Sequence, residues 1–200
     1  NLIKLLAKAG IAAERSCESV SVLPSTLNFA TDPNDDLYCP GVDDPPSPGL
    51  VNSIRNGWIE GNSIICVNRG TKEAPVAFIV AGRSRKKGAD IVNVERAEQG
   101  LDPMRVDIVF CSADEAYRIM LLENNKQERS PLFNARRWQQ HKRVVARRLG
   151  KASLNDSEKI EARKEFAELI EVSESAIASW ETMLEAPPEV LAMVDRKEIS

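Results

Sequence analysis

Four cations crowd one short stretch of the sequence, VAGRSRKKGAD at residues 80–90, directly after an apolar run and a glycine. They are Arg83, Arg85, Lys86 and Lys87. The amino terminus of a helix already carries partial positive charge, so cations in a first helical turn are unfavourable unless an anion lies among them. Amides at such a terminus also donate to phosphate oxygens. The stretch is therefore a candidate phosphate-binding turn; a DNA-facing or merely solvated basic turn is the alternative.

Strands and helices alternate around this turn. A short helix and a glycine-marked turn follow residue 50, and apolar runs predict strands at 64–67 and 76–80. A helix is expected from residue 83 to about 99, ended by Gly100 and Pro103, and a strand at 105–110. Ser112 and Glu115 then form a capping box, which predicts the start of another helix.

The second half of the sequence carries helical signals only. Ser130 and Pro131 are typical of a helix start, and this helix is expected to end near Gly150. Further helices are expected at about 157–169, 173–185 and 188–195. We therefore predict an α+β chain: an N-terminal extension (1–49) with a proline- and aspartate-rich loop or disordered insertion at 32–49, a small mixed α/β domain (50–128) and an all-helical domain (129–200).

Charge is unevenly distributed, although the net charge is only −3. Residues 131–151 hold seven cations and no acid, whereas residues 156–200 hold twelve acids and five cations. A helix with charge on most faces and no acids to pair suits a phosphate backbone better than plain solvent. The candidate DNA-binding residues on it are Arg136, Arg137, Lys142, Arg143, Arg147 and Arg148.

Several classes of function are disfavoured. The longest apolar run, residues 76–81, is far shorter than the roughly 20 residues of a membrane helix, so no membrane partner is expected. The single histidine, His141, excludes a multi-histidine metal site, and a Ser-His-Asp arrangement would have to use it. Four scattered cysteines without a C-x-x-C pair suggest neither a zinc site nor a disulfide framework, and they fit a reducing cytosol.

Four segments together resemble ParB-type partition proteins, over roughly residues 50–200. The segments are LVNSIRNGWIEGNSIICVNRG, FIVAGRSRKKGA, AYRIMLLENNKQERSPLFNA, and the tail from EFAELIEVSESAIASW onward. The family has an "SI…G…PI.V" segment, a "GERRxRA" box and an "ENxxR" box in this order. Ser53, Gly82, Arg85, Glu123 and Asn124 are among the residues at matching positions.

The resemblance implies a ParB/sulfiredoxin-like domain that binds CTP with magnesium, followed by a helix-turn-helix domain. The implied nucleotide-binding residues are Gly82, Arg83, Ser84, Arg85, Lys86, Lys87, Glu123, Asn124 and Arg129, and the implied magnesium ligands are Glu123 and Asn124. Three positions depart from the family's pattern. Ser84 and Lys87 replace the first and third arginines of the first box, and Gln127 replaces the last arginine of the second, with Arg129 as a substitute.

The resemblance also implies the partners. Duplex DNA would be bound through the basic helix and through Ser175 and Ser179 of the helix-turn-helix. A homodimer and a partition ATPase are further implied partners, in the cytoplasm on the nucleoid or a plasmid. The expected recognition helix has no arginine or lysine, two of the residues that most often contact base edges. We therefore expect the helix-turn-helix fold to be retained and its recognition of DNA sequence to be changed.

The leading hypothesis is thus a ParB-like, CTP-dependent clamp or switch in plasmid, chromosome or phage DNA segregation, with slow CTP hydrolysis as an open question. One alternative is a protein-interaction adaptor that kept the fold and lost specific DNA readout, which the acidic C-terminal segment favours. Another is a nuclease or phosphotransfer enzyme built on the same fold. Sulfiredoxin chemistry needs a cysteine in the phosphate loop, and GRSRKKG has none.

Overall fold

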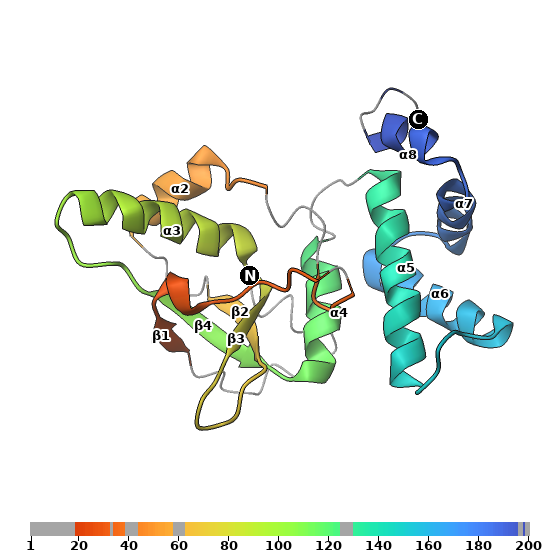
Figure 1. The fold of residues 1–200 in the computed structure, drawn as a ribbon, viewed down its shortest axis with the longest axis horizontal. Coiled ribbons are helices and arrows are strands. Elements are labelled where there is room, and N and C mark those ends of the chain that lie inside the picture. Colours follow the sequence, from red (N-terminus) through yellow and green to blue (C-terminus); the bar gives the residue numbers. More distant parts are fainter. Residues whose placement is uncertain are drawn as a thin grey trace. The chain divides into compact units, whose positions relative to one another are not determined.

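The computed structural model describes residues 19–32, 34–38, 44–57, 63–124, 130–195 and 198. The chain divides into two compact units, Asn1–Glu123 (unit 1) and Asn124–Ser200 (unit 2). Unit 1 combines a four-stranded sheet with helices, and the described part of unit 2 is helical, so the mixed α/β character is confirmed (Figure 1). Within the described residues, no helix has the length and apolar character needed to cross a membrane.

The sheet of unit 1 has the strand order β1-β4-β2-β3. Its central pair, β2 (Ile64–Asn68) and β4 (Val106–Cys111), is parallel, with Ile64 opposite Ile108. Strands β3 (Ala77–Ala81) and β1 (Val20–Val22) flank that pair in antiparallel orientation. The sequence predicted β2, β3 and β4, whereas β1 lies in the N-terminal extension, for which no strand was predicted.

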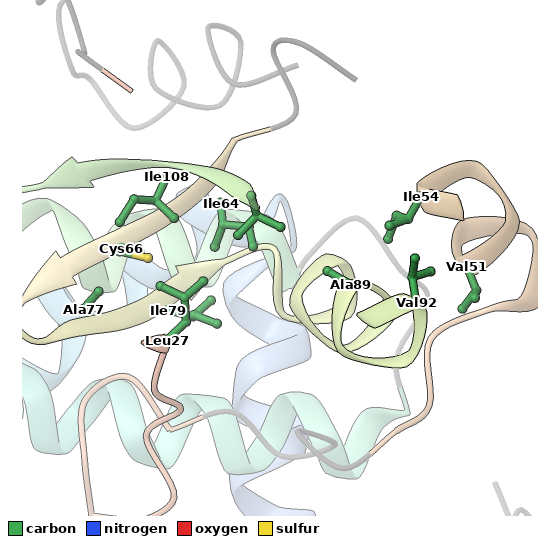
Figure 2. Packing of buried hydrophobic residues seen from close by; sticks show 11 residues of the cluster. Leu27, Val51, Ile54, Ile64, Cys66, Ala77, Ile79, Ala89, Val92 and Ile108 are labelled. Atoms are coloured by element: carbon green, nitrogen blue, oxygen red, sulfur yellow. The ribbon is translucent and has the colours of Figure 1, made fainter. Parts of the chain in front are cut away.

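One face of the sheet is covered by α3 (Arg83–Glu98), and α2 (Pro48–Arg55) packs on α3 (Figure 1). Figure 2 shows the buried cluster that joins these layers, with Ile64 and Ile79 from the sheet, Ala89 and Val92 from α3, and Ile54 from α2. The two helices approach closely because α3 has a glycine where they meet. A Cβ on Gly88 would lie 2.6 Å from Cδ1 of Ile54.

The outer edge of β3 is paired by a residue from outside the named strands. Asn28 follows the short 3-10 helix η1 (Pro24–Thr26). Its amide donates to the carbonyl of Ala77 (3.0 Å), and its carbonyl accepts from the amide of Ile79 (2.9 Å). The N-terminal extension therefore contributes to both sides of the sheet, through Asn28 at one edge and β1 at the other.

Helix α4 (Ala113–Asn124) follows β4 and is opened by the predicted capping box. The Ser112 hydroxyl accepts from the Glu115 amide (3.3 Å), and the Glu115 carboxylate accepts from the Ser112 amide (2.9 Å). Both halves of the box are therefore present, which confirms that prediction. The helix brings Glu123, one of the candidate site residues, to its carboxyl end.

Unit 2 contains four helices in its described residues: α5 (Pro131–Arg148), α6 (Asp156–Ile170), α7 (Glu174–Leu184) and α8 (Pro188–Asp195). As predicted, Ser130 is the N-cap of α5, and its hydroxyl accepts from the Phe133 amide (3.1 Å). The core between α5, α6 and α7 is built around Trp138, Phe166 and Ile177, which are fully buried.

The turn between α6 and α7 contains a strained residue. Glu171 ends α6 in the left-handed region (φ 59°, ψ 46°), and it is the one described non-glycine residue with positive φ. A side chain in this conformation costs roughly 1–2 kcal/mol relative to glycine. Ser173 then caps α7, since its hydroxyl accepts from the Ala176 amide (3.2 Å).

Replacing this strained residue tests the turn. We expect Glu171→Gly to stabilise the protein by roughly 0.5–1 kcal/mol, because the relieved strain exceeds the extra entropy of glycine in the unfolded chain. Urea denaturation followed by tryptophan fluorescence measures the change. The matched control is Glu161→Gly, at an exposed position in the interior of α6, which should destabilise by about 1 kcal/mol. If both variants lose stability equally, residue 171 is not held in the left-handed region.

Candidate functional site

The chain turns from β3 into α3 at Gly82, whose backbone is left-handed (φ 99°, ψ 24°). A Cβ at this position would lie 3.0 Å from the guanidinium of Arg85, which folds back over the glycine. Both observations disfavour any side chain, so the turn requires glycine. Gly82 itself is buried under the Arg85 guanidinium, and the first-turn amides of α3 lie at the helix terminus, where anions are bound.

Arg85 connects the turn to two distant parts of unit 1. Its Nη1 donates to the carbonyl oxygen of Ser63, just before β2, at 2.9 Å. Burial lowers the pKa of the Arg85 guanidinium, and the negative charge of Glu123 at the end of α4 opposes that shift. Glu123, 38 positions further along the sequence, is therefore near enough for its charge to act on Arg85.

The other cations of the turn are also engaged within unit 1. Arg83 Nη2 donates to the carbonyl of Leu37 (2.5 Å), and Lys87 Nζ donates to the carbonyl of Asp44 (2.8 Å). Lys86 pairs with Asp90 one helical turn on (2.6 Å) and lies over the Phe29 ring. Ser84 is exposed.

These contacts bear on one step of the sequence argument. The cations were expected to be unfavourable unless an external anion lay among them. In the structure, oxygen atoms of this chain accept from all four cations, three of them main-chain carbonyls and one the Asp90 carboxylate, so these cations are not without partners before a ligand binds. The Leu37 and Asp44 carbonyls lie in the stretch predicted as a loop or disordered insertion, so their contacts with Arg83 and Lys87 were not predicted. Leu37, 3% exposed, is the lone large aliphatic side chain among its polar neighbours and was the available signal.

Of the two implied magnesium ligands, Glu123 is the one whose side chain the structure describes. Within the described part of the chain, no group of three or more histidine, cysteine or acidic side chains is close enough to hold a metal. Glu123 is half-buried and offers hard carboxylate oxygens. The side chain of Asn124 and the whole of Arg129 lie outside the described residues.

In unit 2, the basic helix α5 separates into exposed and buried cations. Arg136, Arg143, Arg147 and Arg148 are exposed. Arg137 is only 3% exposed, lies over the Phe133 ring and reaches Asn134, because it shares a helix face with the core. We therefore remove Arg137 from the candidate DNA-binding residues.

Lys142 also has a role inside unit 2. Its Nζ pairs with Glu181 of α7 (2.8 Å), and Arg163 of α6 pairs with the same carboxylate (2.7 Å). Burial alone would raise the pKa of Glu181, but the hydrogen bond from Lys142 and the positive charges of Lys142 and Arg163 bring it below its usual value. Glu181 thus joins three helices, and Lys142 is part of that junction.

His141 is a core residue and not a catalytic base. It is fully buried and stacks against Trp138 and Phe166, with ring centroids 5.8 and 5.0 Å away. Burial and the positive charge of Arg148 lower its pKa to about 3, although a hydrogen bond with the backbone of Ala162 opposes the shift. The imidazole is therefore neutral at pH 7 and sealed from substrates, which removes the Ser-His-Asp alternative.

The exposed face of α7 carries hydroxyl groups. Ser175 lies 2.9 Å from the Ser173 hydroxyl, and the Ser179 hydroxyl donates to the carbonyl of Ser175 (3.1 Å). Both serines are exposed. Because the proton of Ser179 is used within the helix, its oxygen is available chiefly as an acceptor.

Comparison with protein-family models gives no match, and comparison with curated proteins gives none either. Two solved structures are similar. One, a Pnob8-like ParB-N domain, is 14% identical with a TM-score of 0.51, covering 90% of this chain and 74% of that one. The other, the C-terminally truncated chromosome-partitioning protein ParB from Caulobacter crescentus complexed to the centromeric parS site, is 17% identical with a TM-score of 0.49, covering 90% and 80%. The first likeness shows that the chain has a ParB-type fold.

The Glu181 junction can be tested through pH. Because the folded-state pKa of Glu181 is lowered, its stabilisation is complete above the ordinary carboxyl pKa and is lost as pH falls through the folded value. We expect Glu181→Gln to cost about 1–2 kcal/mol of unfolding free energy at pH 7. The difference from the unmodified protein should shrink toward pH 3, as Glu181 becomes protonated.

Urea denaturation followed by tryptophan fluorescence at several pH values measures that difference. The matched control is Glu185→Gln at the exposed end of α7, which should change stability by less than roughly 0.5 kcal/mol. A cost for Glu181→Gln that is the same at pH 7 and pH 3 would show that charge at this carboxylate does not hold the helices.

Proposed function

We propose that the chain is a ParB-like DNA-binding partition protein in which unit 1 binds CTP with magnesium and unit 2 binds duplex DNA. The observation that carries the nucleotide part is that the Gly82–Arg85 turn and Glu123, from two separate places in the sequence, lie near enough for the charge of Glu123 to act on Arg85. A glycine turn at a helix terminus, a guanidinium and a carboxylate are the groups that a magnesium-bound triphosphate needs. The ParB-type fold supports the same assignment.

Each group has a separate role in this proposal. The first-turn amides of α3 and the fork of Arg85 bind phosphate oxygens. A guanidinium has five N–H donors, so the hydrogen bond from Arg85 to Ser63 is compatible with additional contacts to phosphate. Glu123 provides an oxygen ligand to magnesium, and bound magnesium neutralises phosphate charge beside that carboxylate. No hydrolytic residue is assigned.

The DNA part of the proposal is carried by the exposed arginines of α5. Arg136, Arg143, Arg147 and Arg148 present positive charge on a helix without an acidic residue. Such a surface suits the phosphate backbone, which positions a protein without reading sequence. Helices α6 and α7, joined by the short turn at Glu171, support a helix-turn-helix in which α7 is the reading element.

A second function is favoured by the chemistry of α7. Its exposed face carries Glu174, Ser175 and Ser179, and a carboxylate there repels the DNA backbone. A protein-interaction adaptor that uses this acidic face is therefore the alternative to sequence-specific recognition. Binding measurements with CTP, ATP, GTP and UTP, each without DNA and with several duplexes of different sequence, separate the two, because an adaptor would show no preference among DNA sequences.

The nucleotide site is tested by Arg85→Ala. Removing a charge-assisted contact should weaken CTP binding by about 1.5–3 kcal/mol, measured by calorimetry in the presence of magnesium. The matched control is Arg105→Ala, an exposed arginine just before β4 and outside the implied site, which should leave affinity unchanged. A thermal melt of each variant confirms that it is folded. Unchanged CTP affinity in folded Arg85→Ala would remove Arg85 from the site.

The DNA surface is tested by replacing Arg143 and Arg147 together by alanine. Affinity for any duplex should fall by a similar factor, and the slope of log affinity against log salt should flatten by about two units. Lys164→Ala, which removes an exposed cation from α6, is the control and should leave the slope unchanged. A loss confined to one DNA sequence would instead mean that these arginines read bases.

A further inference from the structure

A short acidic segment of unit 1, residues 34–38 (the Asp35 segment), lies against the start of α3. Its contact with the phosphate turn is the hydrogen bond from Arg83 Nη2 to the carbonyl of Leu37 (2.5 Å). The Leu37 side chain is 3% exposed, so the segment is seated in unit 1 and not merely near it. The first cation of α3 thus already has a negative partial charge of the same chain beside it.

Asp35 anchors this segment. Its Oδ1 accepts from the amide of Leu37 (2.8 Å) and from Nη2 of Arg69 (2.7 Å), and its Oδ2 pairs with Nη1 of Arg69. Arg69 follows β2 and lies over the Phe78 ring, 4.6 Å from its centroid. The two-pronged ion pair therefore ties the segment to the sheet and orients the peptide whose carbonyl meets Arg83.

A second contact reaches α3 one turn further on. Lys87 Nζ donates to the carbonyl of Asp44 (2.8 Å). Arg83 and Lys87 are thus both engaged by main-chain oxygens from the aspartate-rich part of the sequence. Oxygen acceptors flanked by carboxylates resemble phosphate oxygens in charge and hydrogen-bonding capacity.

We propose that the Asp35 segment competes in cis with the nucleotide for the cations of the phosphate turn. The inference rests on the proposed nucleotide site and adds its regulation. With the segment seated, Arg83 donates to Leu37; when a triphosphate binds, the segment is released and Arg83 turns to phosphate. The apparent affinity is then the intrinsic affinity multiplied by the fraction of molecules whose segment is released. A tighter ion pair between Asp35 and Arg69 therefore weakens nucleotide binding.

Two opposite charge changes test the competition. Asp35→Ala removes a negative charge and Arg69→Gln removes a positive one, and both break the anchor. If the segment is seated in nine molecules of ten, either variant should bind CTP with magnesium about tenfold more tightly. General electrostatics would move the two variants in opposite directions. Asp32→Ala is the control for charge, because the Asp32 side chain accepts from neighbouring Asn34 while its contact with Asp35 is made by the main-chain carbonyl, which alanine keeps; CTP affinity should stay near that of the unmodified protein.

Calorimetry on the full chain separates failure of this inference from failure of the site. If the unmodified protein and both anchor variants bind CTP equally well, the competition is overturned and the nucleotide site stands. If Asp35→Ala tightens binding and Arg69→Gln weakens it, the effect is general charge and the competition is again overturned. If none of these proteins binds CTP, the proposed nucleotide site is overturned and the inference with it.

Hydrogen exchange gives a second readout. The amides of Leu37 and Tyr38 donate to the side chain and carbonyl of Asp35 (2.8 and 3.0 Å). Saturating CTP with magnesium should accelerate exchange of both amides in the unmodified protein, since the segment leaves. Unchanged or slower exchange in protein that binds CTP would show that the segment is a wall of the pocket and not a competitor.

Discussion

The left-handed backbone of Gly82 is the constraint on which the rest of unit 1 depends. It sets the direction in which α3 leaves β3, and so decides which side chains of the basic stretch meet which partners. Arg85 folds back over the glycine to Ser63 and toward Glu123, whereas Arg83 and Lys87 reach the aspartate-rich segments. A residue with a Cβ at position 82 would be strained and would crowd the Arg85 guanidinium. The contacts of the turn with Ser63, Leu37 and Asp44 therefore depend on glycine at this position.

In both units, closely spaced arginine and lysine side chains donate to oxygen atoms of the same chain. In unit 2, Glu181 takes Lys142 and Arg163 into a junction between three helices, which leaves Arg143 and Arg147 on the surface of the basic helix. Charge counted along a sequence therefore overstates the charge offered to a partner. The same helix supplies structural cations on one face and a candidate binding surface on another.

Local signals in the sequence predicted most elements, because capping and periodicity depend on neighbours. The Ser112–Glu115 box and the Ser130 cap are examples, and both are present in the structure. Strand β1 was missed, since three residues carry no alternation to detect and pairing with β4 decides their state. The docking of Leu37 was missed because Arg83 donates to its main-chain carbonyl, and every residue type has such a carbonyl. The burial of Arg137 was within reach, since it lies one turn before His141 on the core face.

The pairing of Asn28 with β3 has a consequence for how the protein behaves among copies of itself. Unpaired strand edges attract the edges of other sheets, and proteins protect them by covering them or keeping them short. In the part of the chain that the structure describes, one side of the sheet is covered by the Asn28 backbone, and the other ends in a strand of only three residues, Val20–Val22. Residues 20–28 thereby cover both edges of the sheet and prevent edge-to-edge aggregation. A chain that began after Asn28 would expose the edges of β3 and β4 to neighbouring molecules.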